Sequence, residues 1–291
     1  MTVLTSRSGE LHIGPGHPTV LINDQVRLMD QRPEALAELR EGRLDTLLEL
    51  AERGHRAGVD MADILLTHPE VDEVQWLPRL AAAVHEALGC SISLDSRHPA
   101  ALEAALKALR PYKALINSVT AERDSLETLL PIAARYGAAV VGMPIGHRHG
   151  LPRTVEGRLE EARVIVETAG RYGIPREDII IDAICLASSA EPGSMAVTLR
   201  TLQALHEELG VATILGIGNA GFGMPHGTSV DLAYLAAAIP WGLDAALVDP
   251  TTPQLLPVVR AADFLAGKDP YGLRYIAYYR AYERGATAHE Q

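Results

Sequence analysis

The stretch ATILGIGNAGFGMP, residues 212–225, changes character halfway along its length. Its first part, Thr213–Ile214–Leu215, is apolar and β-branched, which is typical of a buried strand. The second part, residues 216–219, places Asn219 after two glycines, which let a backbone turn tightly and approach a ligand. Two interpretations are open: a glycine-rich turn in which Asn219 caps the next helix, or a strand end that presents its amide to a ligand. The rest of the chain bears on that choice.

An apolar run followed by a polar residue recurs along the whole chain. Strands are predicted at 19–22, 59–66, 91–94, 113–116, 138–143, 178–181, 213–215 and 245–248. Between them lie segments of helical periodicity, such as the apolar stripe at positions 44, 47, 48 and 51. Eight strand–helix units in fewer than 300 residues predict a single (β/α)₈ TIM barrel, an α/β fold whose parallel sheet is covered on both faces. The main competitor is a doubly wound open sheet, but no GxGxxG motif follows the first strand.

The two ends of the chain complete this prediction. Residues 1–18 are polar and rich in Gly and Pro, and we expect an N-terminal lead-in that is compatible with a hairpin. Residues 19–291 are expected to form the barrel domain. Thr252 and Pro253 are expected to be the N-cap and first residue of the last barrel helix.

Composition bounds the class of protein. The chain has 291 residues, of which 47% are hydrophobic and 22% charged, and its net charge is −11. This acidic balance argues against nucleic acid or an anionic membrane as a main partner, and no apolar run is long enough to span a membrane. The two cysteines, Cys90 and Cys185, lie in strand-like runs and suit buried thiols in a reducing compartment. We expect a cytoplasmic enzyme or small-molecule binder.

Polar side chains end six of the predicted strands: Asp63, Asp95, Asn117, Asp182, Asn219 and Asp249. The active sites of such barrels lie at the carboxyl ends of the strands, so we expect most of these groups to share one mouth. One strand-end Asp usually caps the following helix, but a converging set predicts a binding site. A metal is one explanation, because carboxylates are hard oxygen ligands. The mixed Asp/Asn set without a strand-end His better fits a neutral heterocycle whose N–H and NH₂ donate to one carboxylate.

Several segments resemble the pterin-binding barrel superfamily, to which dihydropteroate synthase belongs. They are LDS at 94–96, INS at 116–118, the IID that ends in Asp182, and LGIGNAGFGMP at 215–225. The likeness is greatest to methyltetrahydrofolate:corrinoid protein methyltransferases, whose strand-seven motif is similar to LGxSNVSFGLP. It also includes residues 121–142, 242–250 and 261–271, and extends from about residue 19 to residue 283.

The resemblance implies a function and a set of site residues. Asp95, Asn117 and Asp182 match family residues that hydrogen-bond the pterin ring, and we group Asp63 with them as a strand-end carboxylate. Asn219 matches an amide near N5 of the folate, which carries the methyl group. Protonation makes N5 a viable leaving group, and an amide that stabilises the protonated form would speed methyl transfer to cob(I)alamin. Methyltetrahydrofolate is then the substrate and a partner corrinoid protein supplies the cobalamin. This chain needs no metal of its own, and the family suggests a homodimer.

The chain also departs from the family pattern. Arg27 stands where a GERIN-like motif has its Asn, and Leu65 stands where DVN or DLN has its Asn. Both serines of SNVS are glycines here, and the usual Pro-Leu after Asp182 is Ala183–Ile184. The sequence leaves open whether Arg27 and Leu65 change the pterin or the methyl donor.

Three alternatives therefore stay open beside the methyltransferase. One is a dihydropteroate synthase-like condensation enzyme, although that family carries a lysine near the end of strand seven and residues 216–221 contain none. The others are a barrel repurposed for another methyl donor and a pterin- or folate-binding barrel without catalysis.

Overall fold

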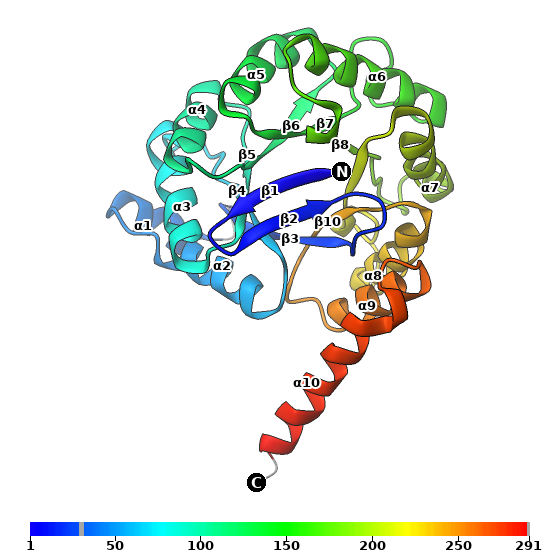
Figure 1. Ribbon diagram of the computed structural model, residues 1–291. Coiled ribbons are helices and arrows are strands. Elements are labelled where there is room, and N and C mark those ends of the chain that lie inside the picture. The colour runs from blue at the N-terminus through cyan, green and yellow to red at the C-terminus, as the bar shows by residue number, and fades with distance from the viewer. Residues whose placement is uncertain (29–31, 290–291) are drawn as a thin grey trace.

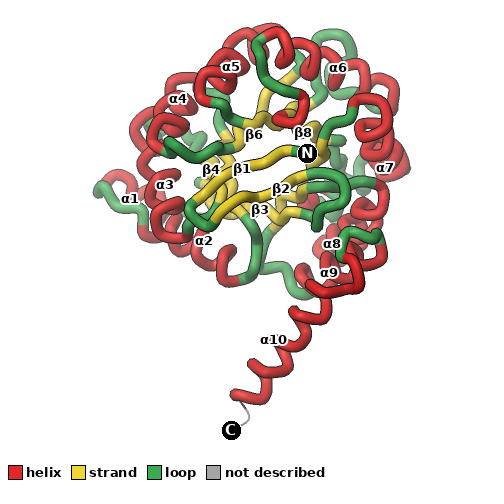
Figure 2. The backbone as a smooth tube through the Cα atoms, viewed as in Figure 1, coloured by secondary structure: helices red, strands yellow, loops and turns green. Residues whose placement is uncertain are grey.

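The computed structural model describes residues 1–28 and 32–289, with side chains as far as residue 281. Eight parallel strands close into a barrel in the order β10-β3-β4-β5-β6-β7-β8-β9, and helices form a ring around it (Figures 1 and 2). The barrel strands are β3 (Val20–Arg27), β4 (Met61–Leu65), β5 (Ser91–Asp95), β6 (Leu115–Thr120), β7 (Ala139–Met143), β8 (Ile179–Asp182), β9 (Ala212–Gly216) and β10 (Ala245–Val248). The prediction of a (β/α)₈ TIM barrel is confirmed.

Helices connect successive strands, and a last helix extends away from the ring (Figure 1). They are α1 (Pro33–Arg40), α2 (Asp45–Arg56), α3 (Glu73–Leu88), α4 (Pro99–Ala108), α5 (Arg123–Tyr136), α6 (Val155–Arg171), α7 (Ser194–Ala204), α8 (Gly227–Ala238), α9 (Leu255–Leu265) and α10 (Leu273–His289). None of the helices in the described ranges is both long and apolar enough to cross a membrane.

The expected start of the last barrel helix was wrong. Helix α9 begins at Leu255, and its N-cap is Gln254, which has a left-handed backbone conformation with φ 66°. Thr252 belongs instead to a turn, since its N–H donates to the carbonyl of Asp249 and its own carbonyl accepts from Leu255. The Asp249 side chain holds that turn by accepting from the N–H and hydroxyl of Thr251, so the turn displaces the helix start.

Alternate residues of each strand pack on opposite sides of the barrel wall. Ile22, Met61 and Ile214 belong to an interior cluster, whereas Leu21, Ala62 and Leu215 belong to the layer between strands and helices. Both layers exclude water, which is why the strands are continuous apolar runs rather than alternating ones.

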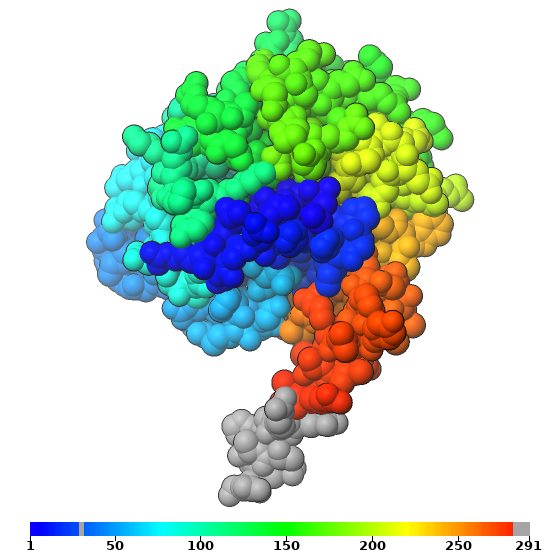
Figure 3. Space-filling view, viewed as in Figure 1, coloured from blue at the N-terminus to red at the C-terminus, as the bar shows by residue number. Residues whose placement is uncertain are grey.

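The amino-terminal end of the barrel is closed by a hairpin of β1 (Thr2–Ser6) and β2 (Gly9–Ile13), which lies across that end in Figures 1 and 3. Leu4 and Ile13 are fully buried and join the interior cluster beside Ile22 and Met61. The hairpin is thus part of the barrel core, and the division of the chain at residue 19 stays a prediction.

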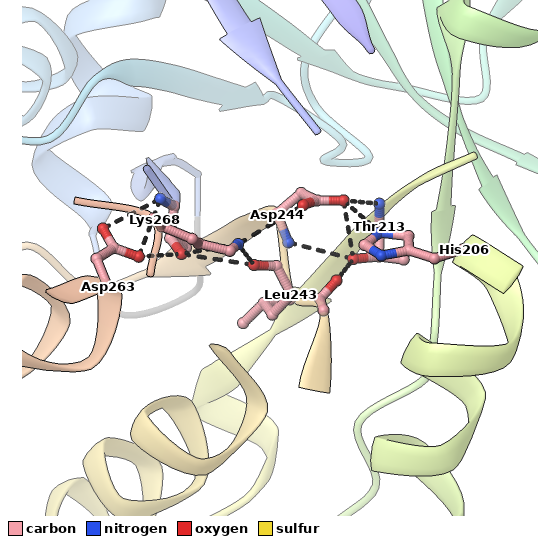
Figure 4. Close-up of polar contacts among 8 residues, drawn as sticks. His206, Thr213, Leu243, Asp244, Asp263 and Lys268 are labelled. Carbon is pink, nitrogen blue, oxygen red and sulfur yellow. Dashed lines mark hydrogen bonds and ion pairs between the residues drawn. The ribbon is translucent and has the colours of Figure 1, made fainter. Parts of the chain in front are cut away.

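The seam between the first and last barrel strands is held by a buried polar network at the same end (Figure 4). The Asp244 carboxylate lies 2.7 Å from Nε2 of His206 and 3.6 Å from Nζ of Lys268, and accepts from the N–H of Thr213. Asp263 accepts from the N–H and hydroxyl of Thr19, at the start of β3. We call these groups the seam network: Thr19, His206, Thr213, Asp244, Asp263 and Lys268.

Candidate active site

A cavity of about 330 Å³ opens at the carboxyl ends of the barrel strands. Its walls combine carboxylates, one guanidinium, an amide and apolar groups: Asp24, Arg27, Asp63, Leu65, Asp95, Gly216, Gly218, Asn219, Phe222 and Leu247. Three predicted site residues, Asp63, Asp95 and Asn219, therefore line one space. A larger hollow of about 490 Å³, bounded by Gln203, His206 and Trp241 among others, takes its lining from α7 and the short helices near it and contains no strand-end residue.

An irregularity in β3 brings two charged side chains into this cavity. The register of β3 against β4 shifts between Asn23 and Val26, which marks a β-bulge. Asn23 points outward, where its amide donates to the carbonyl of Leu50 on α2 at 3.1 Å. On a regular strand the residues 24 and 27 would face opposite sides, but the extra residue in the bulge lets both face inward.

Asp63 sits deep in the cavity and is only 4% exposed. Its Oδ1 accepts a hydrogen bond from the Ser93 hydroxyl at 2.5 Å and another from the Asn117 amide at 3.1 Å. Register places Ser93 directly beside Asp63 on β5, and Asn117 lies one strand further, next to Asp95. Asn117 is thus joined to the site through Asp63 rather than by lining the cavity.

The carboxylates of the buried Asp63 and the half-buried Asp95 lie close together, and neither has a cation within ion-pair distance. Burial raises the pKa of Asp63, the negative charge of Asp95 raises it further, and the hydrogen bonds from Ser93 and Asn117 oppose the rise. Burial likewise raises the pKa of Asp95, against the nearby charges of Arg97 and Arg27. Neither carboxylate forms an ion pair with any residue that the structure describes. Both groups can therefore take up or release a proton near neutral pH.

Asp182 stands apart from that pair. It is buried, does not belong to the cavity lining, and its Oδ1 accepts from the N–H of Ile184 at 2.7 Å. Burial raises its pKa to about 6, while that hydrogen bond and the charge of Arg158 oppose the rise. Ile184 has a left-handed backbone with φ 64°, a strained conformation for a β-branched residue.

A buried arginine behind Asp182 holds this strained turn. Arg158 is 1% exposed, and its Nη1 donates to the carbonyls of Ala183 and Ile184 at 2.7 and 3.1 Å. The same atom donates to the hydroxyl of Thr198. Arg158 thus fixes the backbone that follows Asp182, at the position where the chain departs from the family's Pro-Leu.

Asn219 ends the short helix η3 (Ile217–Asn219) and does not cap α8, whose N-cap residue is His226. Its side-chain amide has no hydrogen-bond partner within the described ranges, so the ligand-facing interpretation is favoured over the capping one. Gly216 leaves room for it, because a Cβ at Gly216 would lie 3.3 Å from Nδ2 of Asn219.

Close backbone packing explains one departure from the family motif. A Cβ at Gly221 would lie 2.2 Å from the carbonyl oxygen of Gly227, so a serine does not fit there in this chain. The N–H of Gly221 donates to Asp231 on α8 at 2.7 Å, which anchors the loop.

The sequence did not reveal every residue of the site. Asp24, Phe222 and Leu247 line the cavity but were not predicted to do so, and the one available signal was the polar Asn23–Asp24 pair after the first apolar run. Asp249, in contrast, turns toward Thr251 and lies outside the cavity lining. In the described part of the chain, no three His, Cys, Asp or Glu side chains are grouped as metal ligands would be.

A closed barrel with buried acids and amides at its carboxyl mouth defines a class of ligand-binding TIM barrels. Residues 34–249 match the family described as pterin binding enzyme, and the chain belongs to that family.

Two curated relatives are similar in sequence. The methylcorrinoid:tetrahydrofolate methyltransferase of Eubacterium limosum is 27% identical over 77% of this chain and 83% of that protein. The methionine synthase of Mycobacterium tuberculosis is 28% identical over 73% of this chain, which spans only 19% of that much longer protein.

Solved structures of similar shape show the same fold. The 7,8-dihydropteroate synthase of Vibrio fischeri has a TM-score of 0.67 at 20% identity, covering 93% of this chain and 100% of that one. A Yersinia pestis dihydropteroate synthase bound to a pterine–sulfa conjugate has a TM-score of 0.66 at 18% identity, covering 91% and 98%. Identities this low carry the fold and not the substrate.

Proposed function

We propose that this protein is a methyltransferase that moves a methyl group between N5 of methyltetrahydrofolate and the cobalt of a corrinoid bound to a partner protein. The observation that carries the proposal is the shared cavity, in which the unpaired amide of Asn219 faces the same space as the carboxylates of Asp63 and Asp95. The similarity to a methylcorrinoid:tetrahydrofolate methyltransferase supports the same reaction.

The carboxylates suit the donor edge of a pterin. This edge presents an N–H beside an NH₂, and a carboxylate accepts both while an amide serves donors and acceptors alike. We assign ring binding to Asp63, Asp95, Asn117, Asp182 and Asn219. The hydrogen bonds of the ring replace water lost by burial, so ligand binding favours the ionised carboxylates of Asp63 and Asp182. Affinity is therefore expected to rise as pH increases through about 6 to about 7, the pKa values of Asp182 and Asp63.

Asn219 is the proposed catalytic residue. Its amide offers a carbonyl oxygen to a protonated N5 and an NH₂ group to an unprotonated one, so a rotation of the amide follows the change in charge. An interaction that is stronger when N5 is protonated lowers the activation free energy for transfer of the methyl group from N5. The electron pair of the N–CH₃ bond stays on nitrogen as the methyl group passes to the cobalt nucleophile.

A dihydropteroate synthase-like condensation is the alternative within this family. The lysine that those enzymes carry near the end of strand seven has no counterpart here, since the three lysines of the chain are Lys107, Lys113 and Lys268. These positions lie far in sequence from β9 and the loop after it, which favours methyl transfer.

The cobalamin is proposed to arrive on a partner that docks at the mouth. Phe222 and Met224, in the loop after β9, are 73% and 44% exposed and offer apolar surface beside the cavity. A homodimer, which the family resemblance suggests, is part of the same proposal.

The direct test is anaerobic mixing of the protein with methyltetrahydrofolate and free cob(I)alamin, followed by cobalt absorbance. Conversion of cob(I)alamin to methylcobalamin at a rate proportional to enzyme is the expected result. Folate binding without any methyl transfer would instead favour a non-catalytic folate-binding barrel, and absence of folate binding would refute the proposal altogether.

A further inference from the structure

Arg27 is a cation in the candidate active site that none of the proposed ring contacts uses. It lines the 330 Å³ cavity, and its Nε is buried without a hydrogen-bond partner. No described residue forms an ion pair with its guanidinium. Arg27 is half-buried, and a ligand anion that pairs with its partly desolvated guanidinium would be bound strongly.

The orientation of Arg27 is built into the chain. The bulge between Asn23 and Val26 turns it inward, and Arg32 fixes its backbone. Nη1 of Arg32 donates to the carbonyls of Gln25 and Arg27 at 2.5 and 3.0 Å, and Nη2 donates to the Gln25 side chain at 3.1 Å. Arg32 thus lies behind the cavity wall and holds the backbone that presents the Arg27 guanidinium to the cavity.

The charge of Arg27 lowers the pKa of Asp24 and of Asp95, but neither described acid lies within ion-pair distance of its guanidinium. Asp24 is held by the Gln25 side chain, whose Nε2 donates to its Oδ1 at 2.5 Å. The neighbour of Arg27 in register on β4 is Leu65, which offers no acceptor at all. Phe222 and Leu247 add apolar lining to the same cavity. A guanidinium beside apolar side chains is complementary to an aromatic group that ends in a carboxylate.

We propose that Arg27 binds a carboxylate of the p-aminobenzoylglutamate tail of the folate, while Phe222 and Leu247 contact the aromatic ring of the tail. This inference rests on the proposed function and deepens it, because it assigns the tail to the β3 edge of the mouth. The chain would then distinguish folates from pterins without a tail.

The test compares two ligands by titration calorimetry: 5-methyltetrahydrofolate and an N5-methylated tetrahydropterin that lacks the tail. The wild type is expected to bind the tail-less ligand about ten- to a hundredfold more weakly, the worth of one charge-assisted hydrogen-bond pair. Arg27→Gln should weaken methyltetrahydrofolate by a similar factor. It should weaken the tail-less ligand clearly less, because that ligand senses the lost charge only through Asp95. Arg27→Lys, which keeps the charge but loses the planar fork, should fall between.

Arg97→Gln is the matched control, because Arg97 follows β5 at the same mouth but lies outside the cavity lining. The charge of Arg97 lowers the pKa of Asp95, so its removal should change the affinity of both ligands by the same factor. Unchanged thermal melting of Arg27→Gln and Arg27→Lys shows that binding, not folding, is being measured.

Equal losses for both ligands in Arg27→Gln would place Arg27 on the pterin ring and overturn the inference. Unchanged affinity for methyltetrahydrofolate would overturn it too, and methyl transfer by that variant would leave the proposed function standing. If the wild type binds neither ligand, the proposed function and the inference fail together.

Discussion

At the amino-terminal end of the barrel, the Asp244 carboxylate is fully buried and lies between His206 and Lys268. At the carboxyl end, Asp63 is almost as deeply buried, yet its partners are a hydroxyl and an amide. Asp244 at the base thus has a cation within ion-pair distance, whereas Asp63 and Asp95 at the mouth have none among the described residues. Figure 4 shows the paired arrangement.

This difference separates structural from functional charge. Removing one member of a buried ion pair leaves the other charge buried without a partner, which destabilises the folded state. The Asp244–Lys268 pair at the base therefore stabilises the fold. A buried carboxylate without a cation costs folding free energy, and such groups with raised pKa cluster where ligands bind. The predictions below test the contrast from the largest expected effect to the smallest.

Asp244→Asn should destabilise the protein by about 3–5 kcal/mol, because it leaves the buried Lys268 without its counter-charge. Urea unfolding at pH 7.5 measures the loss, and folate affinity of the folded variant should equal that of the wild type. A loss below about 1 kcal/mol would mean that the base tolerates unpaired charge as the mouth does.

Asp182→Asn should instead raise the free energy of unfolding at neutral pH. Its pKa rises from 3.8 to about 6 on folding, so the folded state holds a proton that the unfolded state has released. Stability from this group is present below pH 4 and is lost as pH rises through 6, a loss of about 3 kcal/mol. The variant should therefore match the wild type near pH 4 and exceed it by up to about 3 kcal/mol at pH 7.5. Urea unfolding across that range is the measurement, and a difference that does not vary with pH would contradict the assignment.

Asp95→Ala should weaken methyltetrahydrofolate binding by roughly 1.5–3 kcal/mol, the worth of a hydrogen bond to a charged group, without destabilising the fold. Titration calorimetry at pH 7.5 gives the affinity. Asp249→Ala is the control, since that strand-end carboxylate faces Thr251 and should leave affinity unchanged. Equal effects of the two substitutions would remove Asp95 from the site.

Asn219→Ala should lower the methyl-transfer rate constant about tenfold or more, while changing folate affinity less than about threefold. The reason is that its amide is proposed to act mainly on protonated N5. Stopped-flow rates at saturating folate separate the two quantities. A variant with the wild-type rate would make Asn219 a turn residue only.

Much of this architecture could be predicted from the sequence, because parallel strands buried on both faces leave unbroken apolar runs such as Ile179–Ile181. The strand-end rule brought Asp63, Asp95 and Asn219 to one cavity. It failed at Asp249, where a local side-chain turn with Thr251 competes for the carboxylate. The sequence also gave no orientation for the side chain of Arg27. A one-residue bulge reverses the side of the sheet that each following side chain faces, and it leaves no sign in the apolar pattern.

The seam network ties residues from the two ends of the chain, since Thr19 and Asp263 are 244 positions apart. Contacts of such long range contribute to high contact order. The chain must lose the entropy of closing a loop of that length before the pairing of β3 with β10 can stabilise it. A nascent chain on the ribosome consequently cannot close the barrel until β10 has left the exit tunnel, and the seam network is complete only when Lys268 follows. Before then the edges of β3 and of the last strand already paired lie open, and association with another chain competes with closure.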